Sequence, residues 1–511
     1  MLNSNKKIKM KNQFIRLFSI AIVSAMTLSS CENGFEEMNT DPNALTTPSN
    51  KSMFTLAEVY MDGQDYSNTR ANNIYAAQFV QHFASLGGPG SKYTYSGEYS
   101  GSLFGETYGK GLSQTFQLMS VLPNTSENSN MIQACRIMKV YMFQRLTDTY
   151  GEVPYFEAGK GYNGNVFSPK YDTQQVIYND LLKELDEAGD ALDASKPFVG
   201  NADLFYQGDV TKWKKMANSL MLRVAMRLSK VDAAKSKLYV EKAFAKGVFT
   251  SNDDSLILKH DPSPQGVKTN PITSSWVIND LQNGKGSTKF SKTFIDLLKN
   301  NNDPRLRIYA KLEATKDNNP ANQQGLANDA NSIPGGDPTL FSDPNTSTVL
   351  RTDAPTLIMS YAEVQFFLAE AVVKGWNVTG TAKQHYEDGV KAAMEVLTIF
   401  GDKVPAVTTA EYNAYIATPG IAFDAPNALK QIGTQKWIVL LFNGIEAFSE
   451  YRRTGYPVLV PVNDPSGVTD GTIPRRLIYD QTELFTNNAN YKEAIQRQGL
   501  DLMTTRIWWD K

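Results

Sequence analysis

The chain has 511 residues, of which 51 are lysine or arginine and 53 are aspartate or glutamate, giving a formal net charge of -2. The basic residues are scattered along the chain and form no stripe, so the sequence lacks the positive footprint of a nucleic-acid-binding protein. This length can bury a large core and allows up to about three average domains.

At the N-terminus a positively charged segment is followed by an apolar run and a short processing site. Four lysines and Arg16 precede the apolar run Leu17–Leu28, which is the order of an export signal. The run has about a dozen residues, whereas a membrane span needs roughly 20. Leu28-Ser29-Ser30-Cys31 has the shape of a bacterial lipobox. We therefore expect residues 1–30 to be a lipoprotein signal peptide and Cys31 to carry the lipid that anchors the protein to a membrane.

Residues 31–50 form a polar tether rich in turn-forming residues. With Cys31 lipidated, Cys135 is the only remaining thiol, and no intramolecular disulfide can form. Met131, Met138 and Met142 recur with Cys135 at helical spacing. We therefore expect Cys135 to pack as a small apolar side chain in a core and not to act as a nucleophile.

The body after the tether is mostly helical, as judged by the period of its apolar residues. The pattern predicts amphipathic helices over residues 130–150, 173–192, 211–228, 361–373, 381–397 and 429–447. The pair 361–373 and 381–397 is joined by a short link, and its length is close to the roughly 34-residue hairpin of tetratricopeptide arrays. We expect a mostly α fold in which irregular tetratricopeptide-like helical hairpins form a scaffold.

Other segments are rich in glycine, asparagine, proline, serine and threonine, namely residues 87–111, 262–287, 317–348 and 404–427. They are long for loops inside one body, and long ordered loops on a rigid scaffold often carry binding sites. No composition shift marks a domain boundary. We expect one domain over residues 51–511, with a loop-rich subdomain that carries little β structure.

A candidate ligand-binding segment lies within the first of these loops. Tyr93, Tyr95 and Tyr99 stand among glycines and hydroxyl side chains. Sugars present alternating apolar faces and hydroxyl edges, so tyrosine rings with a polar tip suit them, and glycines let the backbone approach a ligand closely. The even spacing of the three tyrosines equally fits a pair of strands packed on the body.

The sequence contains no recognisable catalytic motif. His82, His260 and His385 lie far apart, and there is no H-E-x-x-H, Walker A loop, G-x-S-x-G elbow or EF-hand loop. We expect a binding protein without catalytic residues, metal site or cofactor, and leave a structural calcium open. Two other classes stay open as well. One is a secreted glycoside hydrolase, which needs only two carboxylates about 5–10 Å apart; the other is a scaffold whose hairpins bind only another protein.

Several short segments stand in a distinctive order along the chain. They are Leu146–Tyr155 (LTDTYGEVPY), Pro169–Asp172 (PKYD), Gly208–Leu220 (GDVTKWKKMANSL), Asp303–Leu306 (DPRL), Ser360–Glu363 (SYAE), Phe367–Ala371 (FLAEA), Gln435–Trp437 (QKW), Glu450–Pro457 (EYRRTGYP) and the terminal Trp508-Trp509. Together they resemble the SusD/RagB family of nutrient-binding outer-membrane lipoproteins, and the resemblance covers nearly everything after Cys31.

The resemblance implies a helical body that covers a SusC-type TonB-dependent transporter, captures an oligosaccharide or a peptide, and delivers it to the barrel. It also implies an outer-membrane protein, lipid-anchored at the cell surface, and the acidic residues after Cys31 resemble the signal by which some Bacteroidetes lipoproteins reach that face. In sugar-binding members, a loop after the first helices and residues near the middle of the chain contact the ligand. That correspondence adds Asn270 and Trp276 to Tyr93, Tyr95 and Tyr99 as candidate ligand-binding residues.

Most of the motif residues are expected to serve the fold. The tryptophans of these segments lie on apolar stretches, where aromatic side chains usually pack in the core; they are Trp213, Trp437, Trp508 and Trp509. Arg452 and Arg453 follow Glu446 and Glu450 at helical spacing, which predicts ion pairs near a helix end. Arg305 is expected to be held by a carboxylate in a turn.

Overall fold

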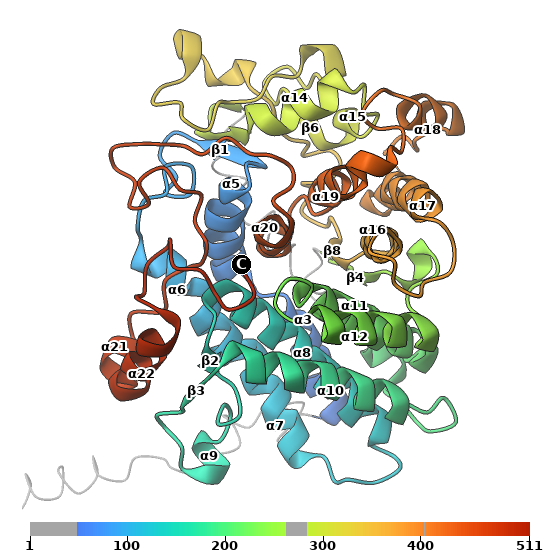
Figure 1. Cartoon of the computed structure of the whole chain (residues 1–511), viewed down its shortest axis with the longest axis vertical. Coiled ribbons are helices and arrows are strands. Elements are labelled where there is room, and N and C mark those ends of the chain that lie inside the picture. Colours follow the sequence, from blue (N-terminus) through green and yellow to red (C-terminus); the bar gives the residue numbers. More distant parts are fainter. Residues whose placement is uncertain (1–48, 262–283, 403) are drawn as a thin grey trace, which may run out of the picture. The chain divides into compact units, whose positions relative to one another are not determined.

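The computed structural model describes residues 49–261, 284–402 and 404–511. Residues from Asn50 onward cluster by their contacts into one unit. Helices dominate that unit and its strands are short (Figure 1), so the prediction of a mostly α fold is confirmed. No helix in these ranges combines the length and the hydrophobicity that a membrane crossing requires.

Helices that follow one another along the chain pack side by side, as expected for hairpins (Figure 1). One series consists of α8 (Ser129–Tyr150), α10 (Gln174–Ala191), α11 (Val210–Arg227) and α12 (Ala233–Lys246). A second consists of α16 (Tyr361–Val373), α17 (Ala382–Glu395), α19 (Ala428–Val439) and α20 (Gly444–Thr454). Four of these helices were predicted with ends that agree to within one residue. They are α8, α10, α11 and α16, which were predicted over residues 130–150, 173–192, 211–228 and 361–373.

The prediction of a single helix over residues 429–447 was wrong. The chain breaks between α19 and α20, where Phe442 has a φ of 71° and the Asn443 side chain accepts a hydrogen bond from the backbone N–H of Glu446. Gly444 then begins α20 against neighbouring backbone, because a Cβ atom there would lie 2.4 Å from the Asn72 carbonyl oxygen. The new helix thus begins at an N-cap residue and at a site of close backbone packing. The period of apolar residues does not reveal either feature.

The remaining helical segments have at most 12 residues each. Those before α8 are α3 (Asn50–Met61), α4 (Asp65–Ser67), the π-helical η1 (Asn68–Ala76), α5 (Ala77–Phe79), α6 (Gly97–Glu106), the π-helical η2 (Thr107–Leu112) and α7 (Ser113–Val121). Later ones are α9 (Gly161–Gly164), α14 (Lys292–Asn300), α15 (Leu306–Tyr309), α18 (Thr409–Ile416), α21 (Glu483–Thr486) and α22 (Asn488–Gln498). Single 3-10 turns occupy Gly200–Ala202, Asn252–Asp254, Pro320–Asn322, Pro334–Gly336, Pro338–Leu340, Val396–Phe400 and Ala425–Asn427.

Two predicted loops therefore contain helices. The segment 87–111 holds α6 and all but the last residue of η2, and the segment 404–427 holds α18. The second helix begins with a capping box, in which Thr408 and Glu411 bond to each other's backbone N–H groups. That Thr-x-x-Glu signature was available in the sequence. The segment 317–348, by contrast, holds no α-helix; it contains three short 3-10 turns and a two-residue strand.

Each ladder in the described ranges joins two short antiparallel strands that are distant in sequence. The pairs are β1 (Phe83–Ser85) with β5 (Thr288–Phe290), β2 (Val153–Pro154) with β3 (Tyr171–Asp172), β4 (Leu256–Leu258) with β8 (Thr356–Met359), and β6 (Ala310–Lys311) with β7 (Asp343–Pro344). These ladders tie irregular segments to the helices and build no layer of their own.

The predicted core residues are buried, except Trp508, which is only partly buried. Cys135, Trp213 and Trp509 are fully buried, and the ring nitrogen of Trp213 donates to the Asp203 carboxylate over 2.8 Å. Trp437 is also buried and donates to the Val80 carbonyl oxygen over 2.8 Å. Large apolar rings with a single N–H suit a core when that N–H has an acceptor, so these tryptophans belong to the fold.

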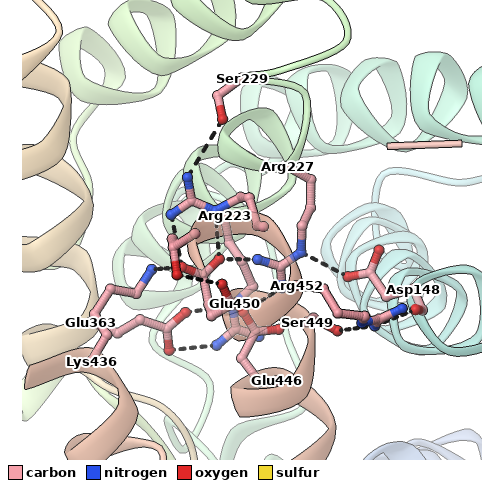
Figure 2. Close-up of polar contacts among 12 residues, drawn as sticks. Asp148, Arg223, Arg227, Ser229, Glu363, Lys436, Glu446, Ser449, Glu450 and Arg452 are labelled. Atoms are coloured by element: carbon pink, nitrogen blue, oxygen red, sulfur yellow. Dashed lines mark hydrogen bonds and ion pairs between the residues drawn. The ribbon is translucent and has the colours of Figure 1, made fainter. Parts of the chain in front are cut away.

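Buried charges meet where five of the helices converge (Figure 2). We call these residues the charge cluster; they are Asp148 of α8, Arg223 and Arg227 of α11, Glu363 and Glu370 of α16, Lys436 of α19, and Glu446, Glu450, Arg452 and Arg453 of α20. Each side chain is no more than 5% exposed. The five cations are matched by five carboxylates, which is the condition under which buried charges are tolerated.

Arg227 is central to the charge cluster (Figure 2). Its guanidinium group donates to Asp148 over 3.0 Å, to Glu446 over 2.5 Å, and to Glu450. Burial by itself would raise the pKa of the Glu450 carboxyl, but the cations Arg453, Lys436 and Arg227 hold that pKa well below its usual range. The Glu450 carboxylate therefore stays ionised in the core and depends on these cations.

The two adjacent arginines of α20 differ in their partners. Arg453 pairs with Glu450 over 2.8 Å, as predicted, and also with Glu370 over 2.6 Å. Arg452 forms an ion pair with neither Glu446 nor Glu450. Its guanidinium group instead donates to the backbone carbonyls of Asp148 and Arg475. Burial lowers the pKa of Arg452 to about 9.

Substitution of Arg227 by methionine is expected to destabilise the protein by about 3–5 kcal/mol, because three buried carboxylates lose a cation while the volume stays similar. The free energy of unfolding in urea measures this loss. The matched control is Lys391→Met on α17, whose side chain is 58% exposed and pairs only with Glu395; it should change stability by less than about 0.5 kcal/mol. Equal unfolding midpoints for the two variants would contradict the role given to Arg227.

Candidate ligand-binding surface

The structure separates the three tyrosines of the predicted binding segment. Tyr93 is buried, packs its ring against Phe79 and accepts a hydrogen bond from the Val462 N–H. Tyr95 is 42% exposed, and Tyr99 is half-buried in the first turn of α6. Among them, Tyr95 offers the most open ring to a ligand.

The alternative of a tyrosine-rich strand pair was wrong. Tyr93 has a φ of 53° and lies in a turn. Ser96 then caps α6 by accepting a hydrogen bond from the Tyr99 N–H. A serine N-cap starts a helix wherever its backbone is extended, and here it overrides the alternation of side chains.

The glycines of this segment serve protein packing. Gly97, Gly101 and Gly105 lie four residues apart on one face of α6, against the chain at Asp480 and Gln481. A Cβ atom on Gly101 would lie 2.8 Å from the Asp480 Cα atom. The prediction that glycines here let a ligand approach the backbone is wrong for these three positions. At these three positions they admit the C-terminal part of the chain instead.

Ser100 of α6 binds the neighbouring C-terminal segment through hydrogen bonds. Its hydroxyl group donates to the Ile478 carbonyl oxygen over 2.7 Å and accepts from the Ile478 N–H over 2.6 Å. The segment therefore follows α6 closely and brings Gln481 to the start of the helix, where its amide nitrogen donates to the Tyr95 hydroxyl. The exposed ring of Tyr95 is held in place by a residue nearly 400 positions away.

A cation and two further rings complete this surface. The Arg70 guanidinium lies 4.0 Å from the centre of the Tyr66 ring and 5.5 Å from that of Tyr99. It also pairs with Glu98 over 2.9 Å. Tyr66 is 40% exposed. We call the surface formed by Tyr66, Arg70, Tyr95, Glu98, Tyr99 and Gln481 the tyrosine platform.

Glu106 of α6 holds residues 64–67, a segment that contains Tyr66 and lies just before Arg70. One carboxylate oxygen accepts the N–H groups of Gln64 and Ser67, each over 3.0 Å, and also the Ser67 hydroxyl. The other accepts from Lys110 over 2.8 Å. Burial would raise the pKa of Glu106, but these hydrogen bonds hold it below its usual value. The ionised carboxylate therefore locks α4 and η1 to α6.

The platform is acidic around the Tyr66 hydroxyl. Burial and the charge of Glu98 raise the pKa of Tyr66, Arg70 opposes them, and Asp480 and Glu106 add to the increase. Tyrosine rings beside carboxylate, amide and guanidinium groups offer apolar faces together with hydrogen-bond donors and acceptors. This combination suits the faces and hydroxyl edges of a sugar ring.

Sequence reasoning missed Tyr66, Arg70 and Gln481. The spacing of four between Tyr66 and Arg70 could have suggested a cation resting on a ring within a helical turn. No local pattern points to Gln481, since its role depends on contact with α6. The other candidates, Cys31, Asn270 and Trp276, lie outside the described residues.

The three histidines stay apart in the fold. His82 is fully buried beside the Trp437 carbonyl oxygen at 2.9 Å, and burial lowers its pKa to about 3. His260 bonds to Thr356 and His385 to Gln365. In the part of the chain that the structure covers, no three His, Cys, Asp or Glu side chains gather as they would around a metal ion.

Comparison with known proteins gives a consistent result. A family model described as SusD-like, starch-binding and associating with the outer membrane matches residues 42–480. Among solved structures, a chitin-binding protein shares 35% sequence identity, with a TM-score of 0.80 over 90% of this chain and 100% of its own. A chitin-binding SusD homologue from Flavobacterium johnsoniae shares 26% identity, with a TM-score of 0.76 over 90% and 98%. A SusD homologue from Bacteroides uniformis shares 27% identity, with a TM-score of 0.73 over 90% and 99%. No curated protein matched.

Substitution of Gly101 by alanine should displace the segment 478–481, because the atom nearest to the added Cβ is the backbone Cα of Asp480. We expect a loss of about 1–3 kcal/mol in the free energy of unfolding. Gly109→Ala is the control, since nothing lies within 4 Å of a Cβ atom there and its φ is not positive; it should be neutral or slightly stabilising. Similar stabilities for both variants would show that α6 does not need its glycine face.

Proposed function

Because the chain belongs to the SusD-like family of starch-binding proteins that associate with the outer membrane, we propose that it is a surface lipoprotein that captures oligosaccharides. We further propose that it delivers them to a SusC-type TonB-dependent transporter. The observation that carries the first part is the tyrosine platform, where exposed rings lie beside polar groups held in fixed positions. Two of the similar solved structures are described as chitin-binding, which supports a polysaccharide-derived ligand.

The platform is preorganised for binding. Arg70 lies between Tyr66 and Glu98, and Gln481 holds the hydroxyl of Tyr95. Rings that are already fixed lose little conformational freedom when a ligand stacks on them, so more of the contact energy contributes to affinity. Loose rings on a mobile loop would bind the same sugar more weakly.

The chemistry of the platform favours capture over hydrolysis. A glycoside hydrolase needs a protonated carboxylic acid near the scissile bond and a second carboxylate across from it. Glu98 of the platform is paired with Arg70, and Asp480, next to Gln481, accepts the Thr482 N–H over 2.9 Å. Both carboxylates are thus engaged as acceptors. We therefore propose a binding protein, and the hydrolase stays the alternative.

Delivery to a transporter requires the protein to stay at the membrane. We propose that the lipid on Cys31 provides this attachment, because acyl chains anchor a protein without a membrane-spanning helix. The helical hairpins provide extended surfaces suited to a protein partner. The transporter-bound state would hold the sugar-loaded protein next to the pore.

Replacement of both Tyr66 and Tyr95 by alanine should weaken binding of maltohexaose or chitohexaose, since full burial of a large apolar side chain contributes about 1.5–3 kcal/mol and each lost ring removes part of that. Isothermal titration calorimetry with both sugars measures the change. The control is Phe167→Ala, an aromatic side chain that is 75% exposed outside the platform. Unchanged affinity in the tyrosine variant, with binding intact in the control, would remove the platform from the site.

Replacement of Cys31 by alanine should release the protein from the membrane fraction of the producing cells, because the acceptor of the acyl chains is gone. In the native protein, mild crosslinking followed by detergent extraction should recover an outer-membrane barrel with it. Mass spectrometry of the mature N-terminus provides the direct check. An unacylated cysteine at that position would contradict the anchor, and extracts that never contain a barrel would contradict delivery.

A further inference from the structure

The structure has a concave surface none of whose lining residues belongs to the tyrosine platform. It lies between α14, α19, the loop 420–427 and the corner at Pro457 and Val458, and it encloses about 440 Å³. Sites for small ligands enclose roughly 300–1,000 Å³. In the view of Figure 1, α14 and α19 lie to the right of α6, which carries part of the platform. We call this surface the α19 cleft.

The floor of the α19 cleft is built from buried polar groups. Gln435 lines it, accepts from the Arg305 guanidinium over 2.9 Å and donates to the Tyr415 hydroxyl over 2.8 Å. Arg305 is fully buried and is held by Asp303, as the sequence predicted. The Asp303–Leu306 and Gln435–Trp437 motifs therefore meet beneath the cleft and give it a rigid base.

One wall of the cleft is equally fixed. Gln431 donates to the carbonyl oxygens of Gly420 over 3.0 Å and Ala422 over 2.8 Å, and accepts from the Asp424 N–H over 2.9 Å. A single buried amide thus ties the loop 420–424 to α19. A site whose supporting residues are locked in this way is prepared for a ligand before the ligand arrives.

The rim carries polar groups that the fold leaves available. Asp424 and Lys430 are exposed, and neither forms an ion pair within the described ranges, although both line the cleft. One oxygen of Asp424 accepts from Asn427 over 2.6 Å, which leaves the other oxygen for a ligand. Val458 is 72% exposed and, with Leu297, supplies an apolar side to the cleft.

We propose that the α19 cleft is a second saccharide-binding site, which takes one or two units of a neutral sugar. Asp424 and Asn427 accept hydrogen bonds from ring hydroxyl groups, and the Lys430 ammonium donates to a hydroxyl oxygen. Leu297 and Val458 cover an apolar face of the ring. This inference rests on the proposed glycan-capturing function, and it gives the chain two separate sites on one body.

Two sites change how the protein selects ligands. When one end of a long glycan occupies the platform, its remaining units stay near the cleft at a high effective concentration, provided that the chain can span the two sites. A glycan long enough to occupy both sites then binds more tightly than a short one that occupies a single site. The pair of sites would favour polymer fragments over free monosaccharides.

The test compares three variants of the purified full chain by isothermal titration calorimetry with maltohexaose and chitohexaose. The cleft variant is Asp424→Asn with Lys430→Met, which keeps both side chains close to their original size. The platform variant is Tyr66→Ala with Tyr95→Ala, and the matched control is Lys391→Met, an exposed lysine of α17 that does not line the cleft. Thermal unfolding of each variant establishes that it is folded.

The native protein and the control should each bind two hexasaccharides. The cleft variant should lose one of them or bind it about tenfold more weakly, since hydrogen bonds to charged groups contribute about that much, while the other site is unchanged. Equal stoichiometry and affinity in the cleft variant and the control, for both sugars, overturn the proposal. If the platform variant binds like the native protein while the cleft variant loses a site, the result supports the second site in the α19 cleft and contradicts the proposed site at the platform.

Discussion

The neutralisation of buried charge determines how the helices of this protein meet. Five cations and five carboxylates from α8, α11, α16, α19 and α20 are enclosed together, and each would be costly to bury without its partners. Apolar side chains of similar volume could fill the same space. They would not require Arg227 of one hairpin series to face Glu446 and Glu450 of the other. Charge pairing therefore adds selectivity to a packing that hydrophobic burial drives.

The tyrosine platform inherits its geometry from this arrangement. α20, which supplies four members of the charge cluster, begins at Gly444 against η1. Asn72 of η1 accepts from the Ile445 N–H over 3.1 Å and donates to the Phe442 carbonyl oxygen over 2.8 Å. η1 also carries Arg70. The position of Arg70, a half-buried cation of the platform, thus depends on the buried ion pairs of α20, because η1 packs against the start of that helix.

Features that depend on residues close together in the chain could be predicted from the sequence, whereas features that depend on distant residues could not. Periodic apolar residues gave the ends of α8 and α16 to within one residue, since a helix facing a core obeys a local rule. The same rule missed the break before Gly444 and the helix α6, because caps and close backbone contacts outweigh periodicity there. The platform shows the contrast most clearly: Tyr95 is visible in the sequence as part of a tyrosine-rich segment, whereas Gln481 becomes its neighbour only after folding.

By itself the sequence determined the helical class, the buried tryptophans, the turn that holds Arg305 and the family resemblance, because each rests on residues close together in the chain or on the order of motifs. Only the tertiary structure decided which of the three tyrosines is exposed, why three glycines line one face of α6, and that Glu370 joins Glu450 in pairing with Arg453. Those outcomes depend on contacts between segments separated by tens to hundreds of residues. Such contacts form through shape and charge in space, and no local spacing encodes them.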